Sequence, residues 1–416
     1  MKLHRPALAL ALTVVAGLAA AETSPYYFGV SQGFSHDANV YRLGDRAVLP
    51  AGLQRSDTVS TSSLLAGLDQ PLGRGRLFGS AALRASRFSD NDGLNNQSYN
   101  ANLGLDWASV DHLSGTLSAA ATQSLARFNP DNDVPTVFRK NVERTQQVDA
   151  RIRLGVVTRW TAEANVGWRQ VDYSADEFRS RAYEQGMASA GLRYRPSAAL
   201  TLGAFARYTD GRFAQYRALG GGGFQADEFQ RQDLDLTGAW VPSAASTLNA
   251  RLTLSRVDHS QAVRRDFSGA TGLLRWQWKP SGKLGFNTVL SRDTGEETAF
   301  LDYGTSQILA SDAFSRTITQ LRINADYELS AKVQLGFGTA WTRRSLADTF
   351  TFGSGVALPR EGRDTGSMLS LNARWAPLRS LLLSCDVSRD RRTSAGALSD
   401  AYSVTVYGCT GQFMLQ

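Results

Sequence analysis

The side chains best suited to chemistry in this sequence are arginines that alternate with apolar residues. Arg151 and Arg153, for example, alternate with Ile152 and Leu154. A row of guanidinium groups along a wall that excludes water creates a positive potential, which attracts anionic solutes. The arginines with this pattern, which we predict to line a pore, are Arg151, Arg153, Arg193, Arg207, Arg251, Arg275, Arg322 and Arg374.

Four acidic residues follow the same alternation and support a second interpretation of these arginines. If the carboxylates pair with arginines across neighbouring strands, the two charges cancel and the wall is stiff and neutral. The acidic residues that we also predict to line the pore are Asp233, Asp235, Asp326 and Glu328. The sequence leaves both interpretations open, an anion-attracting wall and a neutral one.

Histidine chemistry has little support in the sequence. Outside residues 1–21, the histidines are His36, His112 and His259. A Ser-His-Asp hydrolase would need one of them beside a nucleophile, and the chain contains no G-x-S-x-G motif to supply it. We expect histidines in solvated loops or turns, and we do not expect an enzyme.

Motifs for metal, phosphate or nucleic acid are incomplete. The acidic clusters at 90–92 and 131–133 lack the full ligand spacing of a calcium site. The glycine run at 220–223 lacks the Lys-Ser/Thr of a phosphate-binding loop and is expected to be a flexible external loop. The formal net charge of +7 is spread along the chain without a basic stripe. We therefore expect no cofactor, no metal and no nucleic-acid partner.

The elements that carry these residues have a period of two. In residues 333–341, large apolar side chains alternate with small or polar ones, as expected for a strand with one face toward lipid and the other toward a wet lumen. Segments of about ten residues repeat this pattern, and their joints are alternately short and long. Eight short and nine long joints predict an all-β, antiparallel, up-and-down transmembrane barrel of about 18 strands, with 16 as the alternative.

The ends of the chain indicate where such a barrel is placed. Residues 1–21 have the basic start, apolar run and small-residue end of a secretion signal, with cleavage expected after Ala21. Residues 22–416 show no linker or change of composition, so we expect one barrel domain. We predict export to the bacterial outer membrane, insertion by the barrel-assembly machinery, short turns in the periplasm, long loops outside, and a monomer.

Tryptophan placement supports the same architecture. Six of the eight tryptophans lie beside a short joint, where a membrane barrel carries a girdle of interfacial aromatic residues. Trp168 and Trp341 lie toward the other end of their strands. The six residues predicted to form the periplasmic girdle are Trp107, Trp160, Trp240, Trp276, Trp278 and Trp375.

The two cysteines fall in the last two predicted strands. If the hairpin between them centres near Ala397, Cys385 and Cys409 lie opposite each other, where a disulfide is possible in an oxidising compartment. Direct cross-strand disulfides are geometrically demanding, so we favour two small apolar residues facing lipid.

Several short segments resemble one known family. Residues 34–43, FSHDANVYRL, resemble the opening D-N-[LV]-[FY]-R-L of the EpsL-type outer-membrane β-barrel proteins, and residues 55–58, 266–269, 276–280 and 388–402 fit the spacing of later segments. The resemblance implies a part in exopolysaccharide synthesis or export and brings no catalytic residues. Asp37, Asn39 and Arg42 match the opening motif and are expected to order the first external loop.

Three functions follow from this barrel. The first is an aqueous pore or accessory for polysaccharide export. The second is a general diffusion porin, whose constricting loop would come from residues 294–315 or 344–366. The third is a closed barrel whose outer loops bind glycan or a partner.

Overall fold

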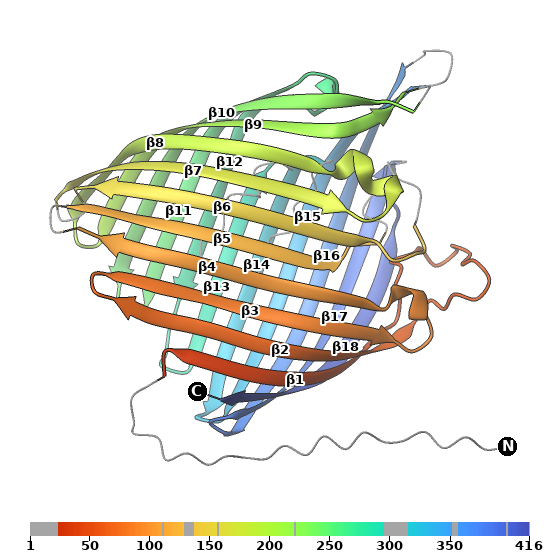
Figure 1. Cartoon of the computed structure of the whole chain (residues 1–416), viewed down its shortest axis with the longest axis horizontal. Coiled ribbons are helices and arrows are strands. Elements are labelled where there is room, and N and C mark those ends of the chain that lie inside the picture. The colour runs from red at the N-terminus through yellow and green to blue at the C-terminus, as the bar shows by residue number, and fades with distance from the viewer. Residues whose placement is uncertain are drawn as a thin grey trace.

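The chain forms a closed antiparallel barrel of 18 strands (Figure 1), which confirms the strand number predicted from the joints. The computed structural model describes residues 24–109, 112–128, 137–155, 158–219, 222–294, 315–351, 357–396 and 398–415. Each strand pairs with its neighbour in sequence, and β1 (Tyr26–Asp37) also pairs with β18 (Tyr402–Leu415), which closes the cylinder. The predicted secretion signal lies outside the described residues.

The strands are 10 to 22 residues long, and those around the middle of the chain and near its end extend furthest. The remaining strands are β2 (Asp57–Leu72), β3 (Gly75–Phe88), β4 (Asn96–Ala108), β5 (Leu113–Leu125), β6 (Val142–Leu154), β7 (Trp160–Tyr173), β8 (Tyr183–Ser197), β9 (Leu200–Ala218), β10 (Phe224–Ser243), β11 (Ser246–His259), β12 (Phe267–Trp278), β13 (Leu284–Asp293), β14 (Ser315–Ser330), β15 (Val333–Thr351), β16 (Ala357–Leu378) and β17 (Leu381–Gly396). Three 3-10 helices, η1 (Asp92–Leu94), η2 (Asp176–Arg181) and η3 (Val263–Arg265), follow β3, β7 and β11.

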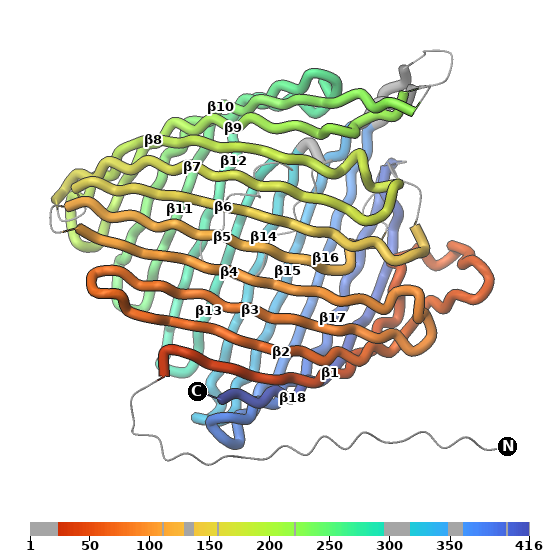
Figure 2. The backbone as a smooth tube through the Cα atoms, in the orientation of Figure 1, coloured from red at the N-terminus to blue at the C-terminus, as the bar shows by residue number. Residues whose placement is uncertain are grey.

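The joints differ at the two ends of the barrel, as the sequence predicts. Eight joints are two to five residues long, such as 73–74 between β2 and β3 and 331–332 between β14 and β15. We call this the short-turn end, and the opposite the long-loop end. One candidate for a constricting loop is wrong, because most of 344–366 continues the β15–β16 hairpin. The other candidate, 294–315, lies almost wholly outside the described residues. The tube in Figure 2 shows the common tilt of the strands, which closure of a barrel requires.

Large apolar side chains point away from the barrel. On β15, Leu335, Phe337 and Trp341 are 40–42% exposed, and on β11 Leu252 and Leu254 exceed 50%. The register aligns such residues across neighbouring strands into one continuous apolar band. Exposure of so large an apolar surface to water is unfavourable, whereas the hydrocarbon core of a bilayer requires an apolar surface. This band therefore contacts lipid. No helix in the described part of the chain is long and apolar enough to cross a membrane.

The band ends where outward side chains become polar. Toward the long loops, the outward position after the last apolar residue is Asp210 on β9, Gln232 on β10 and Arg256 on β11. Arg343 takes this place on β15 and Arg389 on β17. Strand residues beyond this edge therefore lie outside the membrane-spanning part of the barrel.

The long loops beside β1 to β6 fold into a compact cap. Tyr41, fully buried, packs edge-on against Phe128 with ring centres 5.0 Å apart, and Leu94 completes this small core. The Tyr41 hydroxyl donates to the side-chain oxygen of Asn91, at 3.2 Å. Three loops distant in sequence are thus held together by apolar burial.

Candidate functional site: the inner face of the barrel

The strand register places all twelve predicted pore residues on the inner face. On β6, Ile152 and Leu154 point outward, so the residues between and before them, Arg153 and Arg151, point inward. The same alternation directs the other six arginines and the four acidic residues inward, on β8 to β12, β14 and β16. That these residues line a conducting pore is still a prediction, which we develop below.

Glu163 on β7 gathers three of these arginines. Its carboxylate accepts from Nε of Arg153 at 3.1 Å and from Nε and Nη2 of Arg193 at 3.0 and 3.1 Å. Nε of Arg151 is 3.6 Å away. The Glu163 side chain is 7% exposed, whereas the arginines are 33–42% exposed. One buried carboxylate thus neutralises part of the charge on strands β6 and β8.

A second group of charges is buried on β9 and β10. Arg207 contacts Asp233 at 2.9 Å and Asp235 at 3.2 Å, and Arg231 donates through Nε to Asp233 at 2.7 Å. Arg231 also donates to the hydroxyl of Ser255 at 2.9 Å. All four charged side chains are less than 10% exposed. Charges buried this deeply are retained only when they are paired and hydrogen-bonded.

Arg251 on β11 extends this group. It lies 3.5 Å from Asp235 and 3.8 Å from Asp293, and its side chain is 4% exposed. The pairs join β9 to β13 across the inner wall, so the neutral-wall interpretation describes this half of the barrel. Arg231 and Asp293 were absent from the predicted inward residues, although their parity could have identified them.

The opposite half of the inner face is lined by small polar residues. On β15 the inward positions include Gly336 and Gly338, and on β16 Ser370 and Asn372. Several inward side chains on this half are exposed, so water reaches it. They include Arg84, Asn100, Asn102, Asp326, Glu328, Arg374 and Asp386.

The predicted pore residues therefore divide between two walls. Arg151, Arg153, Arg193, Arg207 and Arg251 belong to the paired wall, with Asp233 and Asp235. Asp326, Glu328 and Arg374 belong to the exposed wall near the short turns, and no ion pair joins them to other described residues. Arg322 points inward on β14 and Arg275 on β12.

The expectation of a solvated histidine is wrong for His259. Its side chain is fully buried at the end of β11, and Nδ1 lies 2.9 Å from the Asp227 carboxylate. Burial opposes ionisation of Asp227, but hydrogen bonds from His259 and from the backbone N–H groups of Gln261 and Ala262 lower its pKa. The pair anchors the turn after β11, and Ser260 bonds to Asp227 rather than to the histidine.

Two of the aromatic residues that flank the glycine run at 220–223 are buried. Phe213 and Phe229 are fully buried with Val171 and Tyr183, and the two phenylalanine rings lie 5.7 Å apart. They therefore stiffen the wall instead of lying on a flexible loop. Gly220 and Gly221, and the acidic cluster 131–133, lie outside the described residues. No cluster of His, Cys, Asp or Glu in the described ranges could hold a metal ion.

The residues of the opening motif order the first loop. Arg42, in the left-handed conformation with φ 54°, contacts Asp37 at 2.8 Å. The Asn39 side chain donates to the carbonyl of Leu43 at 2.8 Å and accepts from its N–H at 3.1 Å. These contacts lie within the loop, so the motif supplies local structure and not an exposed ligand site.

Five of the six predicted girdle tryptophans have clearly exposed side chains at the short-turn end. Trp160, Trp240 and Trp375 are 49–58% exposed, and Trp276 stacks on Trp278 with ring centres 5.5 Å apart. Trp107 lies flatter, over Gly115 of the next strand. The position suits a bilayer interface, and that role is still a prediction.

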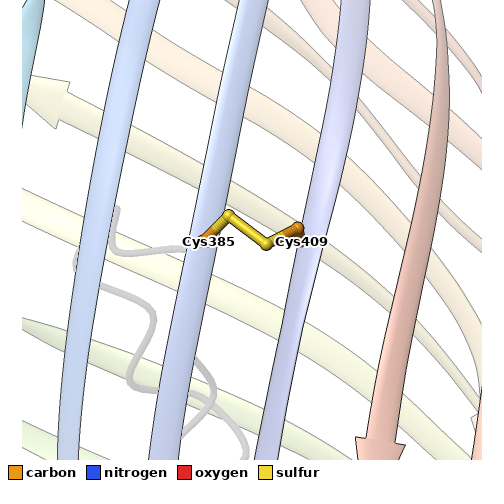
Figure 3. Close-up of a disulfide and its surroundings, with 2 residues drawn as sticks. All are labelled: Cys385 and Cys409. Carbon is orange, nitrogen blue, oxygen red and sulfur yellow. A yellow bond between two sulfur atoms is a disulfide. The ribbon is translucent and has the colours of Figure 1, made fainter.

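The preferred interpretation of the cysteines is wrong. Cys385 on β17 and Cys409 on β18 form a disulfide across the last hairpin, with Cα atoms 4.0 Å apart (Figure 3). The two residues are directly opposite in the register, on the outward face, where Tyr407 and Phe413 are also exposed. The predicted face is therefore correct, but the thiols are joined.

Comparison with known proteins gives only distant similarity. No protein-family model and no curated protein matches this chain. Among solved structures, the outer membrane protein OpdK from Pseudomonas aeruginosa is 12% identical, covers 94% of this chain and 98% of its own, and has a TM-score of 0.46. A BenF-like porin from Pseudomonas fluorescens is 11% identical over 94% and 99%, with a TM-score of 0.44. The siderophore receptor PirA from Acinetobacter baumannii is 6% identical over 94% and 81%, with a TM-score of 0.44.

Proposed function

We propose that this protein is a passive diffusion channel for small hydrophilic solutes in the bacterial outer membrane. The observation that carries the proposal is the division of the inner face into a buried, charge-paired wall on β6 to β13 and an exposed, small and polar wall on the other strands. A polar solute can pass along the exposed wall, because water already reaches its side chains.

Barrel size supports this proposal. Barrels of 16 to 18 strands enclose an interior wide enough for an aqueous channel. Glycine and serine have small side chains, so the exposed wall does not fill this interior. The pairing of Arg207 and Arg251 with acidic residues leaves little net charge on the buried wall, so we expect weak selectivity between anions and cations.

The apolar band and the aromatic girdle support the location. A closed barrel satisfies every strand hydrogen bond internally, which the hydrocarbon core of a bilayer demands. Outer-membrane barrels have short periplasmic turns and long external loops, and we assign the two ends of this barrel in that sense. Secretion through residues 1–21, insertion by the barrel-assembly machinery and a monomeric state are parts of the same proposal.

The test is the chemical modification of introduced cysteines during single-channel recording. Both native cysteines are joined in the disulfide, so no free thiol competes. Asn100→Cys puts a thiol on the exposed wall, and Thr271→Cys puts one on the buried wall, where the side chain is 2% exposed. Hydrophilic methanethiosulfonate reagents of either charge should reduce the conductance of Asn100→Cys channels and leave Thr271→Cys channels unchanged.

Two results would contradict the proposal. A refolded protein with no conductance would show a closed barrel and favour a structural or glycan-binding role. A stable conductance that labelling of Asn100→Cys does not change would place the permeation path elsewhere.

A part in exopolysaccharide export is the second candidate, favoured by the sequence resemblance around Asp37, Asn39 and Arg42. In the structure these residues order a loop of the cap, which suits a surface near a growing polymer. Deletion of the gene should then abolish surface polysaccharide while small-solute uptake stays intact. Normal polysaccharide in the deletion strain would eliminate this candidate.

A further inference from the structure

Four outward-facing arginines lie at or beyond the long-loop edge of the apolar band on three adjacent strands. They are Arg343 on β15, Arg363 on β16, and Arg389 and Arg391 on β17, and we call them the arginine patch. All four side chains are exposed. Within the described ranges, none of them makes a side-chain hydrogen bond or ion pair. Figure 1 shows β15, β16 and β17 side by side in one wall of the barrel.

The register places these arginines as two close pairs. Arg363 lies opposite Ser345, two residues from Arg343, and such diagonal neighbours are about 7–8 Å apart. Arg389 and Arg391 are alternate residues of one strand, about 7 Å apart on the same face. The two arginines of each pair can therefore converge on one anionic group. The two pairs are further apart, because Arg363 lies opposite Ala395, four residues from Arg391.

Some outward arginines on other strands have acidic partners. On β9 to β11, Arg212 lies 3.8 Å from Glu228, and Arg256 lies 2.9 Å from Asp258. Near the arginine patch, Asp364 and Asp390 point inward instead. Asp364 pairs there with Arg344, and Asp390 accepts from the Tyr402 hydroxyl at 2.8 Å. Glu361 is the one outward acidic residue on the described parts of β15 to β17, so the patch keeps a net positive charge.

The depth of the patch in the membrane identifies the kind of partner. On the same outward face, Trp341 precedes Arg343, Val387 precedes Arg389, and Leu369 lies opposite Arg389; these apolar side chains are 42%, 39% and 49% exposed. An arginine on the lipid face is costly at the bilayer midplane but costs little near the interface. The guanidinium groups therefore lie at the level of lipid headgroups, above a wall that acyl chains can cover.

We propose that the arginine patch binds the phosphate groups of an anionic lipid in the outer leaflet. Guanidinium groups bind phosphate oxygens through paired, charge-assisted hydrogen bonds. The acyl chains of the same molecule lie against Trp341, Leu369 and Val387, which a soluble anion could not cover. The proposal uses the assignment of the long-loop end to the outer leaflet, and it is independent of whether the barrel conducts.

The experiment measures binding of lipid A, a phosphorylated glycolipid, to the whole refolded protein in detergent micelles by native mass spectrometry. The test variant replaces all four patch arginines with glutamine. The matched variant, Arg212→Gln/Arg256→Gln, removes outward arginines that already have acidic partners. An arginine near an anionic lipid surface contributes about a fivefold factor in affinity. We expect the test variant to bind lipid A at least tenfold more weakly, and the matched variant to stay within twofold of the wild type.

Urea unfolding and a competition experiment complete the test. Urea midpoints of both variants should equal that of the wild type, and Arg389→Gln/Arg391→Gln replaces the test variant if the fourfold change impairs folding. Equal lipid A binding by wild type and a folded patch variant would overturn the proposal. Displacement of lipid A by equimolar inorganic phosphate or an acidic polysaccharide would also overturn it, because the ligand would then be a soluble anion.

Discussion

Neutralising Glu163 is the most direct test of the paired inner wall. This carboxylate is the shared partner of Arg151, Arg153 and Arg193, with nitrogen–oxygen distances of 3.0–3.6 Å. Glu163→Gln keeps the shape of the side chain but removes its charge. Three guanidinium groups would then face one another across strands β6 and β8 without their common anion.

The size of the effect follows from burial. Removing one partner of a fully buried ion pair costs about 3–5 kcal/mol. Here Glu163 is 7% exposed, but its arginines are 33–42% exposed, so solvent screens part of the interaction. We therefore expect Glu163→Gln to lower the free energy of unfolding by about 1–2 kcal/mol. The lost negative charge should also shift the channel's reversal potential in a salt gradient toward anions.

The assays are urea unfolding of the protein folded in lipid vesicles, and single-channel recording in a potassium chloride gradient. Asp69→Asn is the matched control, because Asp69 and Arg76 form an ion pair with both side chains more than half exposed. This control should leave the urea midpoint unchanged. The reasoning fails if Glu163→Gln has the same midpoint and reversal potential as the control.

Three other perturbations test separate parts of the structure. Replacing Cys385 and Cys409 with alanine removes a disulfide between residues with a sequence separation of 24, and should lower the free energy of unfolding by about 3 kcal/mol. Unfolding is measured with and without reductant. Equal stability of wild type and variant would show that the disulfide does not stabilise the barrel. Asp57→Asn should speed amide hydrogen exchange in the cap. Burial of Asp57 opposes its ionisation, but hydrogen bonds from the side chain of Asn91 and from nearby backbone N–H groups lower its pKa below the usual value of about 3.9. The contribution of the carboxylate to the stability of the cap is therefore complete above that value and is lost as the pH falls through the folded pKa. The difference in amide exchange between wild type and variant should then vanish in strong acid. A difference that stays constant with pH would contradict this account. Gly115→Leu should displace the Trp107 ring, which covers that glycine, and shift the tryptophan fluorescence; an unchanged spectrum would show that the ring packs elsewhere.

The alternation of side chains made the barrel predictable. Apolar positions at every second residue leave one arrangement in which lipid and water each meet their own face, so strand number and inward parity follow from the sequence. The predicted inward direction of Arg151 and Asp233 depends on this parity alone. Short, Pro- and Gly-rich joints likewise marked one end of the barrel.

Pairing across the inner wall was not predictable from one strand at a time. Arg207 contacts acidic residues 26 and 28 positions away, and the choice among such partners depends on register, tilt and burial. The same reason explains His259, whose partner Asp227 lies across a hairpin. The resemblance identified Asp37, Asn39 and Arg42 but did not show their mutual hydrogen bonds.

The sequence by itself determined the fold, the two faces of each strand and the position of the cysteines opposite each other, because these depend on local periodicity and hairpin length. Only the tertiary structure decided that the cysteines are joined, that the inner face has a paired wall and an exposed wall, and that four outward arginines lie on the neighbouring strands β15 to β17. These features depend on which strands become neighbours and on how far each is shifted along the next, since distances between side chains on different strands are set by register and tilt.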